Sequence, residues 1–572
     1  MAYIGHKGSM IYVLWDGIRI HHSRDIRFTN QLWVDYMNEQ KQQTIAAIAP
    51  KPVTLPIEPT SYQQAISLPE AEQWHISMQK ELEALKKKET WIEIPKSEAK
   101  GKILSGKWVY KIKDDGTLKS RWVIRGFEQQ LNPWDETRAA VVQGTTTRIL
   151  LTLAAKYDWD IEVIDINNAF LNGALPEYRE IYLQMPTGFT KPGTVCKLQK
   201  SIYGLKEAAL AWYLTLRDAL EELGLKVAQH DECLFMSTNP QEPLYVTTHV
   251  DDIKICGPGA KTFKELLHKK FPAKPHNLEH YLGLDIKRDR AQRTIHLSQA
   301  SYTASILKEF GHLAAQSNVP ISRPIKDNPD ANPTPEEVKL YQQIVGKLMY
   351  LACQSRPEIH FAVIHTSRHT NRPLPDAWRA IHEILGFIDR TPTHGIKIRG
   401  TDDEIQLHQY GDASFATGTK GRSISGRITL LNGTPITWQS KQQTMVATST
   451  CHSEYIAAYE ATLQALPLQD LLQEMVKPLS ISILPPILHV DNTAAITSAN
   501  KGILTRQNRH FLTKYYWLHE QIEEGNITVK YINTKEQLAD VLTKPSIRHM
   551  LDTFCDSLQL RASPEAEGET DT

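Results

Sequence analysis

Apolar residues first recur at helical spacing near residue 74. Intervals of three and four positions separate the members of this set, and that period predicts an amphipathic helix. The members are Trp74, Met78, Leu82 and Leu85. Ser67 and Glu70 stand three positions apart just before them, which is the spacing of a capping box, so we expect the helix to begin there. A second helical stretch is expected between Tyr341 and Ile388.

Runs of β-branched and aromatic residues predict strands in much of the remaining chain. Val109 and Ile112 lie before Asp115-Gly116 and Trp122 lies after it, an order typical of a β-hairpin. Four further runs end at or enclose acidic residues, and they cover residues 161–166, 244–257, 405–413 and 487–490. A fifth run, 527–532, precedes a short helical pattern over residues 536–542.

Two proline-rich stretches divide the chain, one from Pro50 to Pro59 and one from Pro320 to Pro335. Because proline removes a backbone donor and resists helices and central strands, we interpret both stretches as exposed connectors. Of the 572 residues, 41% are apolar and 23% are charged. This composition is typical of a soluble globular chain with about three to five domains.

Charge is balanced overall but not locally. The 65 Lys and Arg residues match 65 Asp and Glu residues, which excludes a globally basic nucleic-acid coat and a strongly acidic chain. Residues 97–126, however, carry eight basic side chains against three acidic ones. We therefore expect a polyanion to bind at this local patch. Residues 562–572 carry four acids and no base, which predicts a disordered tail.

The six cysteines lie far apart, without a Cys-x-x-Cys pair or histidines at metal-ligand spacing. This pattern argues against a disulfide scaffold and a zinc ribbon, and it fits a reducing compartment. No run reaches the length of about 18 apolar residues that a membrane span needs. Residues 1–15 also lack the layout of a signal peptide. We expect a soluble intracellular protein that does not bind a membrane.

Three acidic residues form the first candidate site. Asp165 belongs to the run 161–166, and Asp251 and Asp252 stand together between two β-branched runs. An acid after a strand is most often a cap or turn residue. Adjacent carboxylates repel, however, and a cation between them removes the repulsion. Three converging carboxylates suit the two-metal chemistry of a polymerase, and hard oxygen ligands favour Mg²⁺, with Mn²⁺ as an alternative.

Four more acids form a second candidate site within the carboxyl-terminal third of the chain. A strand, a helix start, a strand end and a short helix supply them in turn. They are Asp412, Glu454, Asp491 and Asp540. Taken singly, each would be a surface charge. As a set they suit a two-metal nuclease, in which the ions activate water and stabilise the departing 3′-oxygen of an RNA strand.

Asp165, Asp251 and Asp252 stand within blocks that resemble the copia-type long-terminal-repeat retrotransposon Pol polyprotein. The second set of four acids resembles the ribonuclease H domain of the same polyprotein. Residues 165–173 resemble the Asp-Val-x-x-Ala-Phe-Leu-x-Gly block of that family, and residues 249–252 resemble its Tyr-Val-Asp-Asp block. Residues 23–28 resemble the end of its integrase. Other matching blocks follow in family order, at residues 119–127, 201–206, 211–213, 281–283, 355–358, 438–441 and 542–545.

The resemblance implies a multidomain α+β and α/β protein, with a right-hand polymerase of fingers, palm and thumb, a connection and a ribonuclease H-like domain. It divides the chain into an integrase remnant (1–49), a linker (50–66), fingers and palm (67–257), a thumb-like region (258–318), a linker (319–335), a connection (336–400), a ribonuclease H-like domain (401–548) and a carboxyl-terminal tail (549–572). The chain therefore resembles the distal part of a longer polyprotein.

The resemblance also implies roles for individual residues. All seven acids would be catalytic metal ligands, with two Mg²⁺ ions at each site. Lys113 and Arg121 would contact the nucleotide triphosphate, and Phe170 would exclude a ribose 2′-hydroxyl. The primer strand would be gripped by Tyr281, Leu282 and Gly283. Phe170 could instead be an ordinary core aromatic, and Arg121 a solvated strand charge. His510 would assist product release unless it is structural.

The implied function is an RNA-directed DNA polymerase with ribonuclease H activity. Its partners would be an RNA template, a DNA primer, an RNA–DNA hybrid and deoxynucleoside triphosphates; no oligomeric state is implied. The family places such proteins in cytoplasmic particles and the nucleus. Three residues depart from the family's usual pattern: His249 replaces Tyr, Glu207 replaces Gln and His452 replaces Glu. Residues 137–141 also depart from the family's Thr-Phe-Ala-Pro-Val. These departures leave two alternatives, a silent remnant that binds nucleic acid and a nuclease with a dead polymerase.

Overall fold

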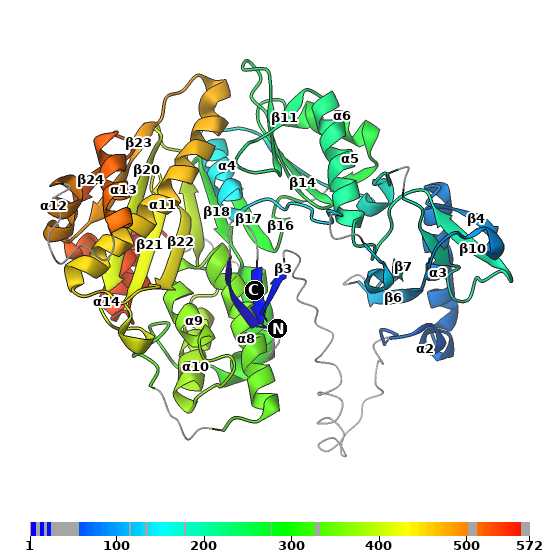
Figure 1. Ribbon diagram of the computed structural model, residues 1–572, viewed down its shortest axis with the longest axis horizontal. Coiled ribbons are helices and arrows are strands. Elements are labelled where there is room, and N and C mark those ends of the chain that lie inside the picture. Colours follow the sequence, from blue (N-terminus) through cyan, green and yellow to red (C-terminus); the bar gives the residue numbers. More distant parts are fainter. Residues whose placement is uncertain are drawn as a thin grey trace.

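A computed structural model of the chain is shown in Figure 1. It describes residues 2–6, 12–15, 20–23, 57–113, 116–131, 135–176, 179–275, 277–326, 332–501 and 512–561. Within these ranges, no helix combines the length and the apolar character needed to cross a membrane. The first three strands form an antiparallel sheet, β1 (Ala2–His6), β2 (Tyr12–Trp15) and β3 (Ile20–Ser23). The rest of the integrase-like segment, His510 and the acidic tail lie outside the described residues.

The predicted amphipathic helix is present as α3 (Ala71–Lys87), and its four apolar residues are buried. The predicted capping box is wrong. Ser67 is instead the last residue of α2 (Tyr62–Ser67), because Leu68 precedes Pro69 and takes up the extended backbone that this position favours. A complete capping box occurs elsewhere, where Thr334 and Glu337 begin α8 (Pro335–Gln354).

The predicted hairpin packs against α3. Its strands are β6 (Gly106–Ile112) and β7 (Leu118–Ile124), and Trp108, Tyr110 and Trp122 point from one face into the core. A four-stranded sheet of order β4-β10-β9-β5 shares that core. Its strands are β4 (Trp91–Pro95), β5 (Ile103–Leu104), β9 (Tyr182–Gln184) and β10 (Thr194–Leu198).

A six-stranded antiparallel sheet holds the predicted Asp-Asp hairpin. Its order is β11-β12-β13-β14-β8-β15. The strands are β8 (Ile161–Ile166), β11 (Leu225–Val227), β12 (Leu234–Ser237), β13 (Tyr245–His249), β14 (Asp252–Cys256) and β15 (Ala273–Pro275). Helices α5 (Ala208–Glu222) and α6 (Ala260–Lys270) cover one face through Ile164 and Ile253. Because side chains alternate along a strand, Asp165 and Asp252 belong to the opposite face.

A second antiparallel sheet, of order β16-β17-β18-β19, joins distant segments of the chain. Its strands are β16 (His280–Tyr281), β17 (Leu284–Asp289), β18 (Thr294–Ser298) and β19 (Gly395–Arg399). The chain leaves β18, forms four helices and returns to pair β19 with β18. These helices are α7 (Ala300–Phe310), α8, α9 (His360–Ser367) and α10 (Pro375–Arg390). They share one large apolar core with the sheet.

The last sheet contains five strands in the order β22-β21-β20-β23-β24. The first three are antiparallel, whereas β20, β23 and β24 are parallel. The strands are β20 (Gln406–Ser414), β21 (Ile424–Leu431), β22 (Thr434–Gln442), β23 (Leu484–Val490) and β24 (Thr528–Tyr531). The helices here are α11 (Thr450–Val476), α12 (Thr493–Lys501), α13 (Leu512–Glu523) and α14 (Arg548–Ser557). Figure 1 shows α11 running along the sheet.

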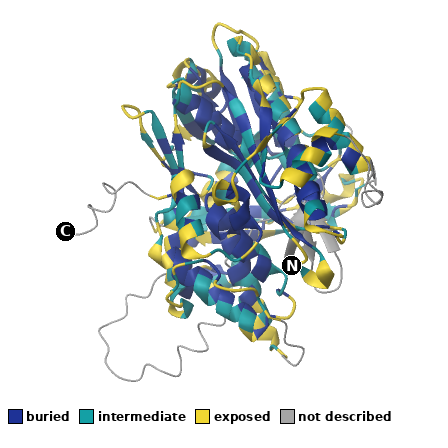
Figure 2. Cartoon of the chain, turned by 90° about the vertical axis from the view of Figure 1, so that its left-hand side faces the viewer, coloured by how far each residue is buried: buried dark blue, intermediate teal, exposed yellow. Residues whose placement is uncertain are grey.

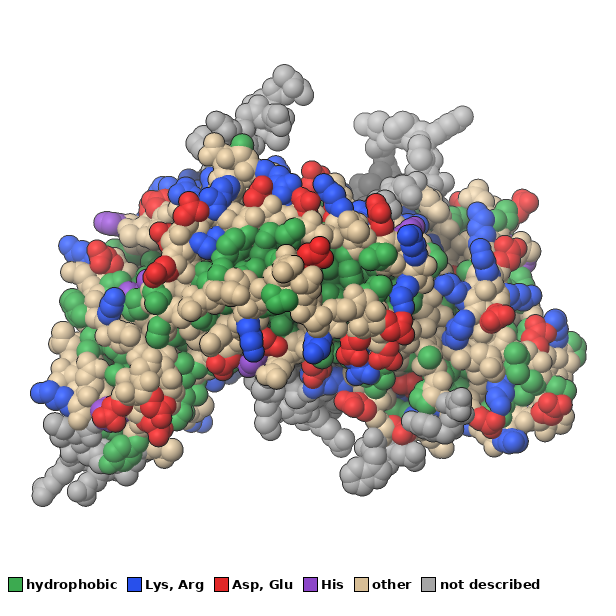
Figure 3. Space-filling model, turned by 90° about the horizontal axis from the view of Figure 1, so that it is seen from above, with side chains coloured by type: hydrophobic (Ala, Val, Ile, Leu, Met, Phe, Trp, Pro, Cys, Tyr) green, Lys and Arg blue, Asp and Glu red, His purple; other side chains and the backbone are tan. Residues whose placement is uncertain are grey.

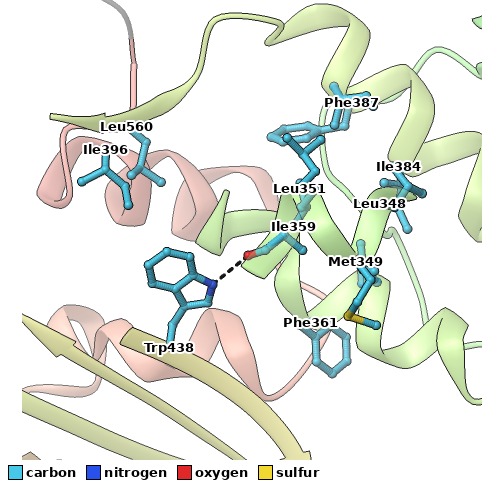
Figure 4. Packing of buried hydrophobic residues seen from close by; sticks show 14 of the residues in the cluster. Leu348, Met349, Leu351, Ile359, Phe361, Ile384, Phe387, Ile396, Trp438 and Leu560 are labelled. Atoms are coloured by element: carbon cyan, nitrogen blue, oxygen red, sulfur yellow. Dashed lines mark hydrogen bonds between the residues drawn. The ribbon is translucent and has the colours of Figure 1, made fainter. Parts of the chain in front are cut away.

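A buried arginine ties this sheet to the rest of the chain. Arg148 lies on α4 (Gly144–Lys156), where its Nε donates to Ile436 O at 2.6 Å and its Nη1 to Gln354 O at 3.1 Å. The guanidinium also lies 4.7 Å from the Trp438 ring centre. Trp438 in turn donates from Nε1 to Ala352 O at 2.8 Å (Figure 4). Figure 2 shows the buried residues on strands and helices in the interior, with exposed residues around them.

We expect Arg148→Met to lower the free energy of unfolding by about 1 to 3 kcal/mol, because two buried carbonyls lose a charged donor. Urea unfolding followed by tryptophan fluorescence measures this loss. Arg217→Met is the matched control, since Arg217 is partly exposed and pairs with its neighbour Asp218. An equal loss in both variants would contradict the role given to Arg148.

Candidate active sites

The first three predicted acids come together at one end of the six-stranded sheet. Asp252 of β14 stands directly opposite Asp165 of β8. Directly opposite residues of antiparallel strands project from the same face, so these carboxylates are neighbours. Asp251 joins them because its carbonyl accepts a hydrogen bond from Ile166 N at 2.8 Å. On the other side of β8, Lys274 of β15 stands opposite Asp165. Sequence reasoning missed Lys274, since only strand register reveals its position.

The turn that presents Asp251 and Asp252 has a strained backbone. Val250 has a φ of +59°, a conformation that disfavours β-branched residues and costs on the order of 1 to 3 kcal/mol. Trp212 holds the turn by donating from Nε1 to Val250 O at 2.6 Å. His249 pairs with Asp252 across the hairpin. The fold therefore fixes the direction of the two adjacent acids.

Tyr203 links two predicted nucleotide contacts to these acids. The Arg121 guanidinium lies 4.8 Å from the centre of the Tyr203 ring, and the Phe170 ring lies edge-on to it at 5.4 Å. Burial raises the pKa of Tyr203 to about 12; Arg121 opposes that shift, while Asp251 and Asp165 add to it. Arg121 and Phe170 are thus gathered beside the carboxylates. Tyr203 belongs to a block noted in the sequence, but no role was predicted for it.

The positive charge of residues 97–126 lies mainly on one face of the β6–β7 hairpin. Lys111 stands opposite Lys119, and Val109 stands opposite Arg121, so these side chains share the face turned away from the tryptophan core. Lys113 follows directly at the end of β6. The pKa of Lys119 is lowered by burial and then by Arg121, Lys113 and Lys274. Cations from the hairpin and from β15 therefore converge next to Asp165.

The predicted primer-gripping residues form the turn between β16 and β17. Leu282 and Gly283 both have positive φ values, of +52° and +70°. The Tyr350 hydroxyl donates to Leu282 O at 2.8 Å. Tyr281, in contrast, is fully buried, and its ring centre lies 5.1 Å from Nζ of the equally buried Lys254. Only Leu282 and Gly283 of the three residues therefore have side-chain or backbone surface exposed at this turn.

Glu207, which replaces the family's usual Gln, has its charge engaged within the protein. Its carboxylate is buried and accepts two hydrogen bonds from Gln129 Nε2, at 2.6 and 2.7 Å. Arg179 Nε lies 3.4 Å away. The charge of Glu207 is therefore offset by groups of the protein itself.

The second predicted set also converges. Asp412 lies in β20, Glu454 in the first turns of α11, and Asp491 just after β23. Each offers a carboxylate oxygen, and the three oxygens lie within 4.8 Å of one another. Glu454 Oε2 accepts a hydrogen bond from Ala413 N at 3.1 Å, which holds α11 on the sheet.

Asp540 approaches this set from a short 3₁₀ helix (Leu538–Leu542). Its Oδ1 lies 2.5 Å from Lys544 Nζ, whereas its buried Oδ2 has no hydrogen-bond partner among the described residues. Thr543 Oγ1 donates to Asp412 Oδ2 at 2.8 Å. The sequence block 542–545 contained both Thr543 and Lys544, but no role was predicted for either. Their hydrogen bonds show that they orient the acids.

The electrostatics of the second site favour a bound cation. Burial raises the pKa of Glu454 to about 9, and the neighbouring Asp412 and Asp491 add to the shift. The pKa of Asp412 rises to about 7 through burial, with Asp540 as the next cause. A divalent ion would offset this repulsion and give the orphaned Asp540 oxygen a partner. The all-oxygen donor set fits Mg²⁺ or Mn²⁺.

Residues 88–325 match a protein-family model described as reverse transcriptase (RNA-dependent DNA polymerase). The chain is 32% identical to the Retrovirus-related Pol polyprotein from transposon RE2 of Arabidopsis thaliana, over 86% of this chain and 34% of that protein. It is 33% identical to the corresponding polyprotein from transposon TNT 1-94 of Nicotiana tabacum, over 85% of this chain and 38% of the relative. The chain thus spans about one third of the length of these relatives.

Solved structures with similarity to the chain are more distant. A foamy viral protease–reverse transcriptase in complex with double-stranded DNA is 14% identical, covering 88% of this chain and 75% of that chain, with a TM-score of 0.23. The N-terminal RNase H domain of a Mycobacterium tuberculosis protein is 10% identical, covering 27% of this chain and 98% of that one, with a TM-score of 0.19.

Proposed function

Because this chain is homologous to copia-type retrotransposon Pol polyproteins over most of its length, we propose that it is an RNA-directed DNA polymerase with ribonuclease H activity. The observation that carries the proposal is the register of the six-stranded sheet, which sets Asp252 beside Asp165 and carries Asp251 in the adjoining turn. The convergence of Asp412, Glu454 and Asp491 supports a second, separate centre.

We assign the sheets to parts of a polymerase accordingly. The hairpin β6–β7 with α3 would form the fingers, and the six-stranded sheet the palm. The sheet β16-β17-β18-β19 and its helices would form the thumb and connection. The mixed five-stranded sheet with α11 would be the ribonuclease H-like domain.

In the polymerase site, Asp165, Asp251 and Asp252 would hold two Mg²⁺ ions. When bound, these ions activate the primer 3′-hydroxyl and stabilise the leaving pyrophosphate. Arg121, which lies over the Tyr203 ring, would donate hydrogen bonds from its guanidinium to the triphosphate. The reaction joins the 3′-oxygen to the α-phosphorus, breaks the bond to the β-phosphate and releases pyrophosphate. Lys113 and Lys274 add positive charge where that product forms.

In the nuclease site, Asp412, Glu454, Asp491 and Asp540 would hold the metal ions. There the ions supply an activated water and stabilise the departing 3′-oxygen. Thr543 fixes the Asp412 carboxylate, and Lys544 neutralises part of the charge on Asp540. Hydrolysis breaks one phosphodiester bond of the RNA strand and consumes one water.

Incorporation of labelled deoxythymidine triphosphate on polyadenylate with an oligothymidylate primer tests the proposal, with Mg²⁺ or Mn²⁺ present. We expect incorporation by the unaltered chain and none by Asp251→Asn. If a folded chain binds the template–primer without incorporation, the silent-remnant alternative holds. If it also cleaves the RNA of a hybrid, the protein is a nuclease with a dead polymerase.

We expect Phe170→Ala to weaken discrimination against ribonucleotides by at least about tenfold, because the smaller side chain no longer fills the space of a 2′-hydroxyl. Competing incorporation of dTTP and UTP on one template measures the ratio. Phe170→Tyr serves as the matched control, since it keeps the ring that packs edge-on to Tyr203. An unchanged ratio in Phe170→Ala would make Phe170 an ordinary core aromatic.

A further inference from the structure

Phe127 is the most exposed large apolar side chain in the described part of the chain, with 79% of its surface accessible. It belongs to a 3₁₀ turn, Gly126–Glu128, which begins two residues after the end of β7. A single exposed apolar side chain is common on protein surfaces and by itself indicates nothing. Two features of the surroundings of Phe127 set it apart.

The first feature is a backbone that is fixed on both sides of the exposed ring. Arg125 N donates to Ser105 O at 2.9 Å, and Glu128 accepts from Ser105 N at 2.8 Å and from Ser105 Oγ at 2.5 Å. A Cβ on Gly126 would lie 2.2 Å from Gly204 O, so the turn also packs tightly against the loop that follows Tyr203. The ring is therefore presented to solvent from a rigid support.

The second feature is a set of three basic side chains at the turn, from Arg125, Lys102 and Lys206. Arg125 is exposed beside Phe127. Lys102 Nζ donates to Glu128 O at 2.8 Å, and Lys206 Nζ donates to Gln129 O at 2.9 Å. Glu128 is the one acid in the turn, and Ser105 engages its carboxylate. Basic side chains around an aromatic ring are the features that bind single-stranded nucleic acid, through phosphate contacts and base stacking.

The direction of β7 relates this surface to the polymerase site. Arg121, earlier on the strand, lies on Tyr203 beside the carboxylates, and the strand then runs toward Phe127. On the face of the molecule seen in Figure 3, basic and acidic side chains lie intermixed. The β6–β7 hairpin thus carries cations next to the carboxylates, and the turn that follows it carries the exposed Phe127 ring.

We propose that Phe127 stacks on an unpaired base of the template strand, while Arg125, Lys102 and Lys206 contact its phosphates. The proposal rests on the polymerase function proposed above, since it takes the template as the single strand. It adds a template contact to a residue to which the family resemblance gave no role.

Fluorescence anisotropy tests this contact without catalysis, in the presence of a metal chelator. The probes are an RNA–DNA duplex with a blunt end and the same duplex with a four-nucleotide 5′ template overhang. We expect the overhang to tighten binding, and Phe127→Ala to weaken binding of the overhang duplex by about 5- to 100-fold. Binding of the blunt duplex should stay unchanged. Phe127→Trp should retain the gain, because it keeps an aromatic face.

Ile92→Ala is the matched control, since Ile92 is another exposed apolar residue in the same part of the chain, on β4. An abasic overhang should remove the effect of Phe127→Ala, because both changes delete one stacking contact. The proposal would be overturned if Phe127→Ala weakened binding of the blunt and overhang duplexes equally, or if it bound the overhang duplex as tightly as the unaltered chain. The exposed side chain would then be available to contact a protein partner. Failure of the polymerase function would look different: overhang-dependent binding would persist without incorporation.

Discussion

Asp412→Asn is expected to reduce cleavage of RNA in an RNA–DNA hybrid by about 10³-fold, because one metal ligand carries several kcal/mol of transition-state stabilisation. Incorporation of nucleotides by the same protein should stay within about twofold of the unaltered chain, since distant, independent sites behave additively. The acids of the first site lie in or beside the six-stranded sheet, and those of the second lie in the five-stranded sheet or in segments next to it, which makes this separation a direct consequence of the fold.

Paired assays on one protein preparation measure both activities. Asp402→Asn is the matched control. Asp402 lies four residues before β20, its side chain is exposed, and it pairs with Arg293. Cleavage should be unaffected in that variant. If Asp412→Asn lost incorporation and cleavage together, the two sites would not be independent, or the substitution would have unfolded the chain, which circular dichroism distinguishes.

The strands and the places of the acids could be predicted because their signals are local. A run such as 161–166 is rich in β-branched residues, and the acid near its end can be found without knowing the partner strand. The pairing of Asp165 with Asp252 was expected only from chemistry and resemblance, and the register now places them opposite each other. Lys274 had no local signal, because its importance comes from pairing across a strand 109 positions away in sequence.

Other features depended on tertiary contacts that a sequence pattern does not carry. Arg148 looks like a helix surface residue, yet it hydrogen-bonds a carbonyl 288 positions away. Tyr281 was expected to meet the primer, but it is packed inward over Lys254. The misplaced capping box shows the opposite limit. The spacing of Ser67 and Glu70 matched the motif, but Pro69 holds Leu68 in an extended conformation, so no capping box forms there.

Because the acids of the nuclease site are buried close together, we expect the free energy of unfolding to depend on pH and on bound metal. Glu454 and Asp412 have pKa values raised to about 9 and about 7, so at neutral pH the folded chain binds more protons than the unfolded chain. The free energy of unfolding contributed by these groups therefore falls as pH rises through that window. Buried histidines titrate mainly below it, since burial lowers the pKa of His489 to about 4. Lys254, with a pKa lowered to about 8, acts in the opposite direction.

Comparing variants isolates the acids, because the histidines and Lys254 are common to all of them. Without metal, the double variant Asp412→Asn and Glu454→Gln should melt at a higher temperature than the unaltered chain at pH 8.5, by about 2 to 8 °C, and the difference should shrink toward pH 6. Millimolar Mg²⁺ should raise the melting temperature of the unaltered chain by more than that of the double variant, because the double variant keeps the polymerase carboxylates but loses two ligands of the nuclease site. Differential scanning fluorimetry over this pH range measures both effects. A difference independent of pH would mean that the substitutions act through packing, and an equal response to Mg²⁺ would place the bound ion elsewhere.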